Sequence, residues 1–465
     1  MVSVNPRSWE AYQLLHEGTL AFSRAERQGF RIDIDYVDAK IKQLYQKQQD
    51  LEEEFKQTNF YKHWEHSVKG KVNLNSGDQL GHFLYDVRKI EPAKTTKTGK
   101  GSTDEEALQS LDIPELDFFI QRTKIKKTLD VLEGFQREQV NGYVHPFYNL
   151  HTVVTYRSSS DRPNFQNIPK RDEEQMKACR RALFPRPGHQ LMEVDFSGVE
   201  VRVAACYHKD PNMIRYIKDP TTDMHGDMAK QIFLLDSYDK STHGHKVLRQ
   251  AAKNGFVFPE FYGSYYKTVS VNLACTWGKL PKGKWKKGQG IQISEDETLS
   301  DHLIANGIRS LDAFEGHMKE IEQDFWEVRF PDYNEWRERW FNIYKKYGYF
   351  DTLTGFRCSG LMEKKEVINY PVQGSAFHCN LWSFIQVDKL IQEENWDTKL
   401  VGQIHDSMIL DVNTDELDHV AKTIQRITSK DLLEHYSWII VPMEVEMELC
   451  PIDASWMKKE VYKNE

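Results

Sequence analysis

Two short apolar runs that each end in an aspartate constrain the fold of this chain more than any other feature. The first run covers residues 191–195 and ends at Asp195, and the second covers residues 400–406 and ends at Asp406. A carboxylate is a poor sheet residue but a good ligand for a hard cation. Two of them on neighbouring strands could hold a pair of Mg²⁺ ions about 4 Å apart, the geometry of in-line displacement at phosphorus. The pair therefore predicts phosphoryl or nucleotidyl transfer.

Each aspartate also has an ordinary structural interpretation. Asp195 precedes a predicted helix that starts near Gly198, where an aspartate commonly serves as the N-cap. His405, Asp406 and Ser407 together fit a polar hairpin turn. Neither segment alone separates metal binding from these roles.

The length and composition describe a soluble, folded protein of several parts. At 465 residues the chain exceeds what one core can hold, so two to four subdomains are expected. Residues 1–10 lack the apolar core of a signal peptide, and no stretch approaches the roughly 20 apolar residues of a membrane span. The six cysteines are scattered, which predicts reduced thiols and a cytoplasmic protein.

Periodicity predicts a mixture of helices with a small sheet. Helical spacing marks residues 9–60, 225–265, 311–347 and 374–395, and a further helix is expected from Gly198 to about Tyr216. Residues 400–412 resemble a hairpin with Asp406 near its tip, and residues 441–447 alternate as a half-buried strand. The order of these elements predicts an α+β fold whose small antiparallel sheet carries both aspartates.

Basic loops provide a second signal, although the net charge of −8 argues weakly against nucleic acid. One basic stretch contains Arg88, Lys89, Lys94, Lys97 and Lys100, and the other contains Lys279, Lys282, Lys284, Lys286 and Lys287 around Trp285. Basic loops with an embedded aromatic suit a phosphate backbone. A solvated charged loop explains either stretch equally well.

Two sets of polar side chains are candidates for substrate contacts. Arg249 and Lys253 are four residues apart on a predicted helix, so they share a face and could embrace a triphosphate. A solvated basic face is the commoner reason for such a pair, but aromatic residues continue this side of the helix. Amide and guanidinium donors that could reach the minor groove are Arg157, Asn164, Gln166, Asn369 and Gln373. Turns and caps are the alternative roles for each of these segments.

Together and in this order, the segments resemble the polymerase module of family A DNA polymerases, the DNA polymerase I group. The matching segments are 155–169, 195–202, 223–225, 249–263, 369–374 and 405–407, with thumb-like segments at 72–76 and 97–103. The resemblance implies a right-hand fold of palm, fingers and thumb. The implied boundaries are 1–150 for an N-terminal connector and thumb, 151–210 and 350–465 for the palm, and 211–349 for the fingers.

The resemblance also implies residue roles and cofactors. Asp195 and Asp406, helped by the Phe196 carbonyl, would bind two Mg²⁺ ions, with Mn²⁺ as an alternative. The implied nucleotide-binding residues are Arg249, Lys253, His225, Phe258, Tyr262 and Glu200, of which Tyr262 would stack at the templating position and Glu200 would exclude a ribose 2′-hydroxyl. The implied contacts to primer–template DNA are Arg157, Asn164, Gln166, Asn369, Gln373 and His405.

Three departures from the family pattern stand out. Counting from Lys253 places the sugar-facing aromatic at Val257, whereas counting back from Tyr262 places it at Phe258. We predict Phe258, with a π-bulge that absorbs one extra residue. Ser407 replaces the usual glutamate, and Tyr156 replaces the usual glycine.

The predicted function is template-directed DNA synthesis from deoxynucleoside triphosphates. A single-subunit RNA polymerase is the alternative enzyme, which Glu200 disfavours because a carboxylate there crowds the 2′-hydroxyl. A non-catalytic DNA-binding scaffold is the other alternative, which the intact set of metal and triphosphate residues disfavours. We expect a monomer without a membrane segment and without an exonuclease on this chain. A separate exonuclease, helicase or processivity factor is compatible with it. A compact polymerase-only chain resembles those encoded by some bacteriophages, which implies a viral replication enzyme in a host cytoplasm. A bacterial repair role is the alternative.

Overall fold

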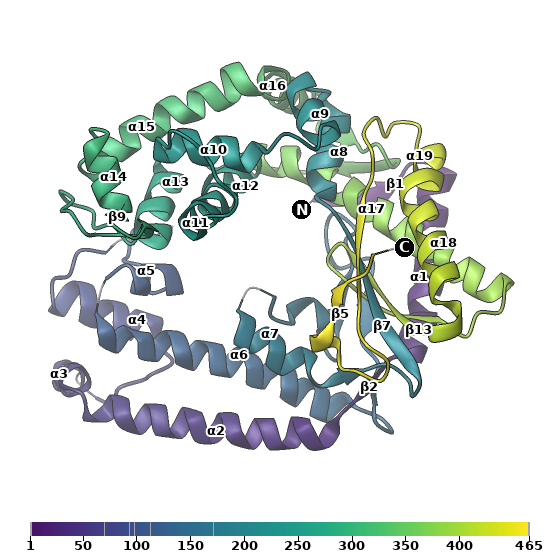
Figure 1. The fold of residues 1–465 in the computed structure, drawn as a ribbon, viewed down its shortest axis with the longest axis horizontal. Helices are drawn as coiled ribbons and strands as arrows, with labels where there is room; N and C mark the ends of the chain where they lie inside the picture. The colour runs from purple at the N-terminus through teal and green to yellow at the C-terminus, as the bar shows by residue number, and fades with distance from the viewer. Residues whose placement is uncertain are drawn as a thin grey trace. The chain divides into compact units, whose positions relative to one another are not determined.

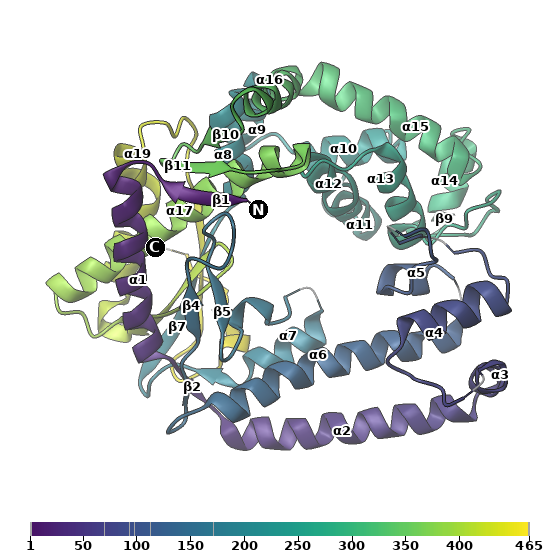
Figure 2. The same cartoon turned by 180° about the vertical axis from the view of Figure 1, so that it is seen from behind.

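A computed structural model of the protein describes residues 2–68, 70–92, 94–96, 98–111, 113–170 and 172–463. The backbone divides into two compact units (Figures 1 and 2). The first unit comprises Met1–Gln46, Lys124–Lys218 and Asp332–Glu465, and the second comprises Lys47–Thr123 and Asp219–Pro331. Long helices accompany short antiparallel strands, so the α+β prediction is confirmed.

The central element of the first unit is a five-stranded antiparallel sheet with the order β12-β13-β7-β14-β15. Its strands are β7 (His189–Phe196), β12 (Lys399–Ile404), β13 (Ser407–Asn413), β14 (Val445–Leu449) and β15 (Glu460–Val461). The β12–β13 hairpin and the sheet that carries Asp195 confirm the strand predictions for these segments. Asp406 lies in the hairpin turn, directly before β13.

Alternation along β7 and β13 gives the sheet one apolar face. Met192 and Val194 of β7 share a core with Met408 and Leu410 of β13. Helices α1 (Trp9–Gln28) and α17 (Lys364–Glu393) contribute to the same core. Glu193 and Asp195 alternate with these apolar residues and therefore point to the other face of the sheet.

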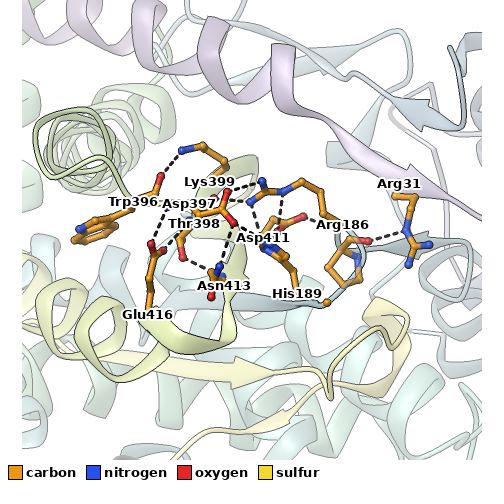
Figure 3. Close-up of polar contacts among 12 residues, drawn as sticks. Arg31, Arg186, His189, Trp396, Asp397, Thr398, Lys399, Asp411, Asn413 and Glu416 are labelled. Carbon is orange, nitrogen blue, oxygen red and sulfur yellow. Dashed lines mark hydrogen bonds and ion pairs between the residues drawn. The ribbon is translucent and has the colours of Figure 1, made fainter.

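A polar cluster fastens the end of the β7–β13 pair that lies away from Asp195 (Figure 3). Buried Asp411 accepts hydrogen bonds from the Arg186 backbone N–H at 2.7 Å and from Arg186 Nε at 3.3 Å. His189 Nδ1 lies 2.7 Å from the same carboxylate, while His189 Nε2 lies 3.2 Å from Asp397. These contacts join β7 and β13 to the chain segments beside them and so favour a single register.

The first unit contains further strands and helices besides this sheet, α1 and α17. Its further strands are β1 (Ser3–Pro6), β2 (Phe30–Ile32), β3 (Tyr143–Val144), β4 (Phe147–Asn149), β5 (Ser159–Asp161), β6 (Leu183–Phe184), β10 (Tyr349–Asp351) and β11 (Phe356–Ser359). Its further helices are α7 (Glu173–Arg180), α8 (Val199–His208), α9 (Pro211–Lys218), α18 (Leu417–Arg426) and α19 (Leu432–His435). Helices α2 (Ile34–Gln57), α6 (Asp117–Glu138) and α16 (Pro331–Tyr347) run across the boundaries between the two units.

Helices are the main regular elements among the described residues of the second unit. Its helices are α3 (Asn59–Ser67), α4 (Gly77–Gly81), α5 (Glu105–Gln109), α10 (Met224–Phe233), α11 (His243–Ala252), α12 (Phe258–Phe261), α13 (Tyr266–Asn272), α14 (Leu299–Ala305) and α15 (Leu311–Asp324). Strands β8 (Gln292–Ser294) and β9 (Glu297–Thr298) form a small hairpin. An aromatic core, in which Phe55 stacks on Phe118 at 3.9 Å, holds the 47–123 part together.

Helical turns with π geometry recur in the chain. They are η1 (His82–Val87), η4 (Lys253–Val257), η5 (Leu273–Trp277), η6 (Phe325–Arg329) and η8 (Ile427–Asp431). Short 3₁₀ turns complete the described elements: η2 (Pro114–Leu116), η3 (Phe165–Asn167), η7 (Thr414–Glu416) and η9 (Trp456–Lys458).

The structure corrects several local predictions. The helical stretch 9–60 is interrupted by β2. This strand follows Gly29, whose φ of 64° lies in the left-handed region. The single helix expected after Gly198 is two helices, α8 and α9, and the strand expected from residue 441 begins only at Val445. Local periodicity missed these breaks because tertiary packing decides where a marginal helix or strand ends.

The two basic stretches also differ from expectation. Trp285 is buried against Phe314, with ring centroids 6.0 Å apart, so it is a core residue and cannot stack on a nucleic-acid base. In the first stretch, Lys94 forms an ion pair with Glu106, and Lys100 lies 3.6 Å from Asp78. Lys97 lies outside the described residues.

All six cysteines are buried and free, as expected for reduced thiols. A search of the described residues finds no helix with the length and apolar character needed to cross a membrane.

Candidate active site

The sheet register places Asp195 and Asp406 next to each other. Asp195 on β7 pairs with Ser407, the first residue of β13. The Phe196 backbone N–H donates to the Asp406 carbonyl at 3.3 Å, so the two aspartates are diagonal neighbours across the strand pair. His405 makes the turn with φ of 54°, in the left-handed region. The prediction that distant segments bring these two residues together is therefore confirmed.

Two cations stand beside the two carboxylates. Arg157 bridges Glu200 and Asp406, with Nη1 3.0 Å from Glu200 Oε1 and Nη2 3.3 Å from Asp406 Oδ1. Lys170 Nζ lies 3.7 Å from Asp195 Oδ2. Lys170 was not among the predicted site residues, because a lysine beside a proline in a polar loop carries no distinctive signal.

These cations do not fully compensate for burial. The pKa of Asp406 is raised to about 6, mainly by burial and to a smaller extent by the charges of Glu200 and Asp195, while Arg157 opposes the shift. Burial also raises the pKa of Asp195, while Lys170 opposes it. The pair therefore favours additional positive charge at neutral pH.

The donor set fits Mg²⁺ rather than a softer metal. Among the described residues, no group of three histidine, cysteine or acidic side chains converges on one point. Mg²⁺ is usually held by one or two carboxylates together with waters and substrate phosphates. Two adjacent aspartates with raised pKa values meet this requirement.

Glu193 lies near the position where the family pattern would have a second carboxylate. Ser407 Oγ is 3.4 Å from Glu193 Oε1, and the Glu193 side chain is buried. Glu193 accepts hydrogen bonds from Trp456 Nε1 at 3.1 Å and Lys459 Nζ at 2.6 Å, and Arg180 lies at 3.6 Å. Burial raises the pKa of Glu193, but the charges of Lys459 and Arg180 outweigh it and hold the pKa below its ordinary value. Sequence reasoning missed this residue, although a glutamate inside an apolar run was a visible signal.

Tyr156 adopts a conformation that explains why the family pattern has glycine there. Its φ is 54°, which lies in the left-handed region that favours glycine. The tyrosine hydroxyl donates to the Val4 carbonyl at 2.6 Å, and its ring lies 5.3 Å from that of Phe356. These contacts hold the unfavourable backbone and leave Arg157 directed at Glu200 and Asp406.

Four of the predicted DNA-contacting residues line one open cavity of about 340 Å³ in the first unit. They are Arg157, Asn164, Gln166 and His405. The Gln166 amide also forms hydrogen bonds within the protein. Its Nε2 donates to Gln403 Oε1 at 3.0 Å, and its Oε1 accepts from the His405 N–H at 2.8 Å. Asn164 caps the following turn by accepting from the Asn167 N–H at 3.2 Å.

The remaining two predicted DNA contacts lie on α17. Asn369 and Gln373 are both partly exposed there, and neither lines the cavity beside Arg157. The helix passes close to the Arg157 segment, because a Cβ at Gly374 would lie 3.0 Å from the Thr155 carbonyl. Gly374 therefore permits this approach.

The predicted triphosphate residues gather in the second unit. His225 of α10 packs edge-to-face on Phe258, with ring centroids 5.7 Å apart, and Lys253 Nζ lies 5.3 Å from the Phe258 ring centre. Burial, together with the charges of Arg249 and Lys253, lowers the pKa of His225 to about 4. The histidine is therefore neutral at physiological pH and can donate one hydrogen bond.

Asp223 holds Arg249 in place. Arg249 Nε lies 2.8 Å from Asp223 Oδ2, and Nη2 lies 2.9 Å from Oδ1. Burial raises the pKa of Asp223, but the hydrogen bonds from Arg249 outweigh it and leave the pKa below its ordinary value. Asp223 also caps α10 through the Gly226 N–H at 3.1 Å. Sequence reasoning had matched Asp223 to a family motif but assigned it no role.

The predicted π-bulge is confirmed between α11 and α12. Residues Lys253–Val257 form the π-helical turn η4. In an α-helix a residue lies beside the one four positions later, whereas in a π turn it lies beside the one five positions later. Phe258 thus comes beside Lys253, whereas Val257 is buried, and Tyr262 follows as a residue that is 43% exposed.

Comparison with known proteins decides the family. The model of DNA polymerase family A matches residues 41–279 and 309–458. The chain belongs to this family.

Its relatives include bacterial and phage polymerases. This family A chain is 27% identical over 446 residues to DNA polymerase I of Chloroflexus aurantiacus, covering 92% of this chain and 41% of that protein. It is 25% identical over 417 residues to a DNA polymerase of Bacillus phage SP01, covering 84% of this chain and 41% of that protein. The chain thus spans about two fifths of the length of these relatives.

A solved structure supports the fold. The POL domain of Pol1 from M. smegmatis, in complex with DNA primer-template and dNTP, matches with a TM-score of 0.72 and 20% identity. The match covers 96% of this chain and 70% of that one. This likeness confirms the predicted right-hand polymerase fold.

Proposed function

We propose that this family A chain is a template-directed DNA polymerase that extends a primer 3′-hydroxyl with deoxynucleotides by two-metal-ion nucleotidyl transfer. Membership of DNA polymerase family A supports the reaction class. The observation that carries the proposal is the strand register that brings Asp195 beside Asp406. Primer–template DNA and deoxynucleoside triphosphates are the proposed substrates.

The proposed division into palm, fingers and thumb cuts across the two units. Residues 151–210 and 350–465 form the palm, 211–349 form the fingers, and 1–150 form the connector and thumb. Asp195 and Asp406 would hold Mg²⁺ with help from the Phe196 carbonyl. Arg157, now paired with Glu200 and Asp406, would turn toward the primer–template end. The other DNA contacts proposed are Asn164, Gln166, Asn369, Gln373 and His405.

The nucleotide would be held by the cluster around Phe258. Arg249 and Lys253 supply positive charge for the triphosphate, and neutral His225 donates a hydrogen bond to it. Phe258 would face the sugar and Tyr262 would stack at the templating position. When bound, the two Mg²⁺ ions would lower the pKa of the primer hydroxyl and offset the charge of the triphosphate and leaving pyrophosphate.

Primer extension by the purified chain tests the reaction. We expect incorporation that requires Mg²⁺ or Mn²⁺ and that disappears in Asp195→Ala and Asp406→Ala, while both variants still bind primer–template DNA. Glu393→Ala, which removes an exposed carboxylate from α17, is the matched control and should extend normally. Full extension by either aspartate variant would refute the proposal.

Sugar selection separates this enzyme from an RNA polymerase. Glu200 is partly buried and fixed by Arg157, so a carboxylate stands at a defined place near Asp406. We expect deoxynucleotides to be strongly preferred over ribonucleotides, and Glu200→Ala to reduce that preference. Equal use of both sugars by the wild type would favour the RNA polymerase instead.

A further inference from the structure

A proline lies inside α17, between the two proposed DNA contacts on this helix. Pro371 stands between Asn369 and Gln373, which are four residues apart and share a face. A proline has no N–H and its ring crowds the preceding turn, so it bends a helix. We define the proline turn as residues 367–375. The placement of Asn369 and Gln373 therefore depends on how the proline turn is held.

A tryptophan of α16 supplies the donor that the proline lacks. In a regular α-helix the N–H of residue 371 would donate to the carbonyl of Val367, four residues earlier. Trp340 Nε1 donates to that carbonyl instead, at 3.2 Å. Val367 is fully buried, so water cannot take the place of the indole. Because a buried carbonyl without a donor is costly, the Trp340 N–H stabilises the proline turn.

A tyrosine of α8, which packs against α17, holds the other side of the proline turn (Figure 1). The buried Tyr207 hydroxyl donates to the Pro371 carbonyl at 3.2 Å and lies 2.8 Å from Ser375 Oγ. It also accepts from the Leu353 backbone N–H at 2.9 Å. A hydroxyl has one hydrogen and two lone pairs, so these three partners satisfy it completely. The proline turn is thus held from two helices, α8 and α16.

Ring packing fixes the tryptophan and the tyrosine relative to each other. The rings of Trp340 and Tyr207 meet edge-to-face, with centroids 5.8 Å apart. Trp336 stacks on Trp340 at 5.6 Å, and the Phe350 ring lies 5.7 Å from Trp340. A side chain packed among several rings is held in one rotamer. The indole N–H and the tyrosine hydroxyl are therefore presented to α17 from a defined aromatic cluster within the first unit.

We propose that Trp340 and Tyr207 are positioning residues, which hold the proline turn so that Asn369 and Gln373 meet the primer–template. Neither Trp340 nor Tyr207 touches the DNA in this proposal, and both act through α17. Neither lies in the segments that carry the family resemblance. The inference rests on the proposed function, because Asn369 and Gln373 are proposed DNA contacts. It adds two residues, from α8 and α16, to those on which DNA binding depends.

Binding of primer–template DNA in a chelating buffer tests the inference without any catalytic step. The test variant is Trp340→Phe, which keeps an aromatic ring and removes the indole N–H. The matched control is Trp396→Phe, which removes an indole N–H that donates to Glu394 at 2.9 Å in the same unit. We expect Trp340→Phe to weaken DNA binding about fivefold, the size of one lost hydrogen bond, and the control to bind as the wild type does.

Restoring the backbone donor separates positioning from general stability. Pro371→Ala returns an N–H that can reach the Val367 carbonyl, so the indole N–H is no longer needed. Pro371→Ala itself should weaken DNA binding by changing the turn, but Trp340→Phe should then have no further effect. In the Gln373→Ala background the effect of Trp340→Phe should become smaller, because one of the contacts that it positions is absent. An equal effect of Trp340→Phe in all three backgrounds would overturn the inference.

Steady-state extension gives a second measurement. Trp340→Phe and Tyr207→Phe should raise KM for the primer–template, while kcat and KM for deoxynucleotides stay within about twofold of the wild type. Unchanged DNA binding in Trp340→Phe, or an equal rise in both KM values, would contradict the inference. A wild type that binds the primer–template but does not extend it would count against the proposed function alone, so the two failures are distinguishable.

Discussion

Replacing Asp406 with asparagine is expected to abolish synthesis while making the metal-free protein more stable. The carboxylate is forced to ionise in a partly buried place beside Glu200 and Asp195, which raises its pKa from 3.8 to about 6. A pKa that is raised by about 2 units means that ionised Asp406 costs the folded state about 3 kcal/mol. This penalty already includes the favourable charge of Arg157, so Asp406→Asn should gain about 3 kcal/mol at pH 8.

The sign of the pH dependence follows from the raised pKa. Between about pH 4 and pH 6 the folded wild type binds a proton that the unfolded chain releases. Wild-type stability should therefore fall as the pH rises through this window, and stability of the variant should fall less. The advantage of Asp406→Asn should be full above about pH 7 and should shrink to less than about 1 kcal/mol near pH 4.

Denaturant unfolding in a chelating buffer at several pH values measures this difference. Glu393→Gln, at an exposed position of α17, serves as the control and should match the wild type throughout. Adding Mg²⁺ should stabilise the wild type more than Asp406→Asn, because a ligand that binds only the folded state adds to its stability. A variant that is less stable than the wild type at pH 8 without metal, or an advantage that does not vary with pH, would refute this reasoning.

Four further variants test other parts of the site. Glu193→Gln should lower the free energy of unfolding by about 3 kcal/mol at pH 7, because it leaves buried cations without their partner. The pKa of Glu193 is lowered in the folded protein, so the difference from the wild type, measured by denaturant unfolding, should become smaller as the pH falls below about 4.5. Phe258→Leu should raise KM for deoxynucleotides several-fold in steady-state extension, whereas Val257→Leu should mainly affect stability because that side chain is buried; the opposite pattern would return the sugar-facing role to position 257. Asp223→Asn should weaken the hydrogen bonds that position Arg249, and it should therefore change KM for the triphosphate more than the affinity for DNA. An unchanged KM would show that Asp223 is not needed to position Arg249.

The parts of the site that follow from local sequence were predicted correctly. The run of apolar residues before each aspartate gave the hairpin and the neighbouring strand, because alternation and turn chemistry act over a few residues. The extra residue between Lys253 and Tyr262 indicated the π turn at Lys253–Val257, because a helix can absorb one residue only by such a bulge.

The parts that depend on packing were not predictable in this way. Trp285 looked like a stacking residue among lysines, but the fold buries it against Phe314. Lys170 and Glu193 join the site through contacts with segments far away in the chain. Sequence spacing carries no record of such long-range neighbours, so only the assembled sheet reveals them.

The pairing of β7 with β13 decides where this family A chain can change in length. Pairing runs without interruption from Ser407–Asp195 to Asn413–His189, and Asp411 fastens its far end to Arg186 and His189. One residue added within either strand would turn Asp195 to the opposite face, away from Asp406. Insertions and deletions should therefore be excluded from these strands, whereas residues 280–308 lie between the two segments that the family model matches. A peptide grafted onto this chain should therefore be inserted within residues 280–308 and not within β7 or β13.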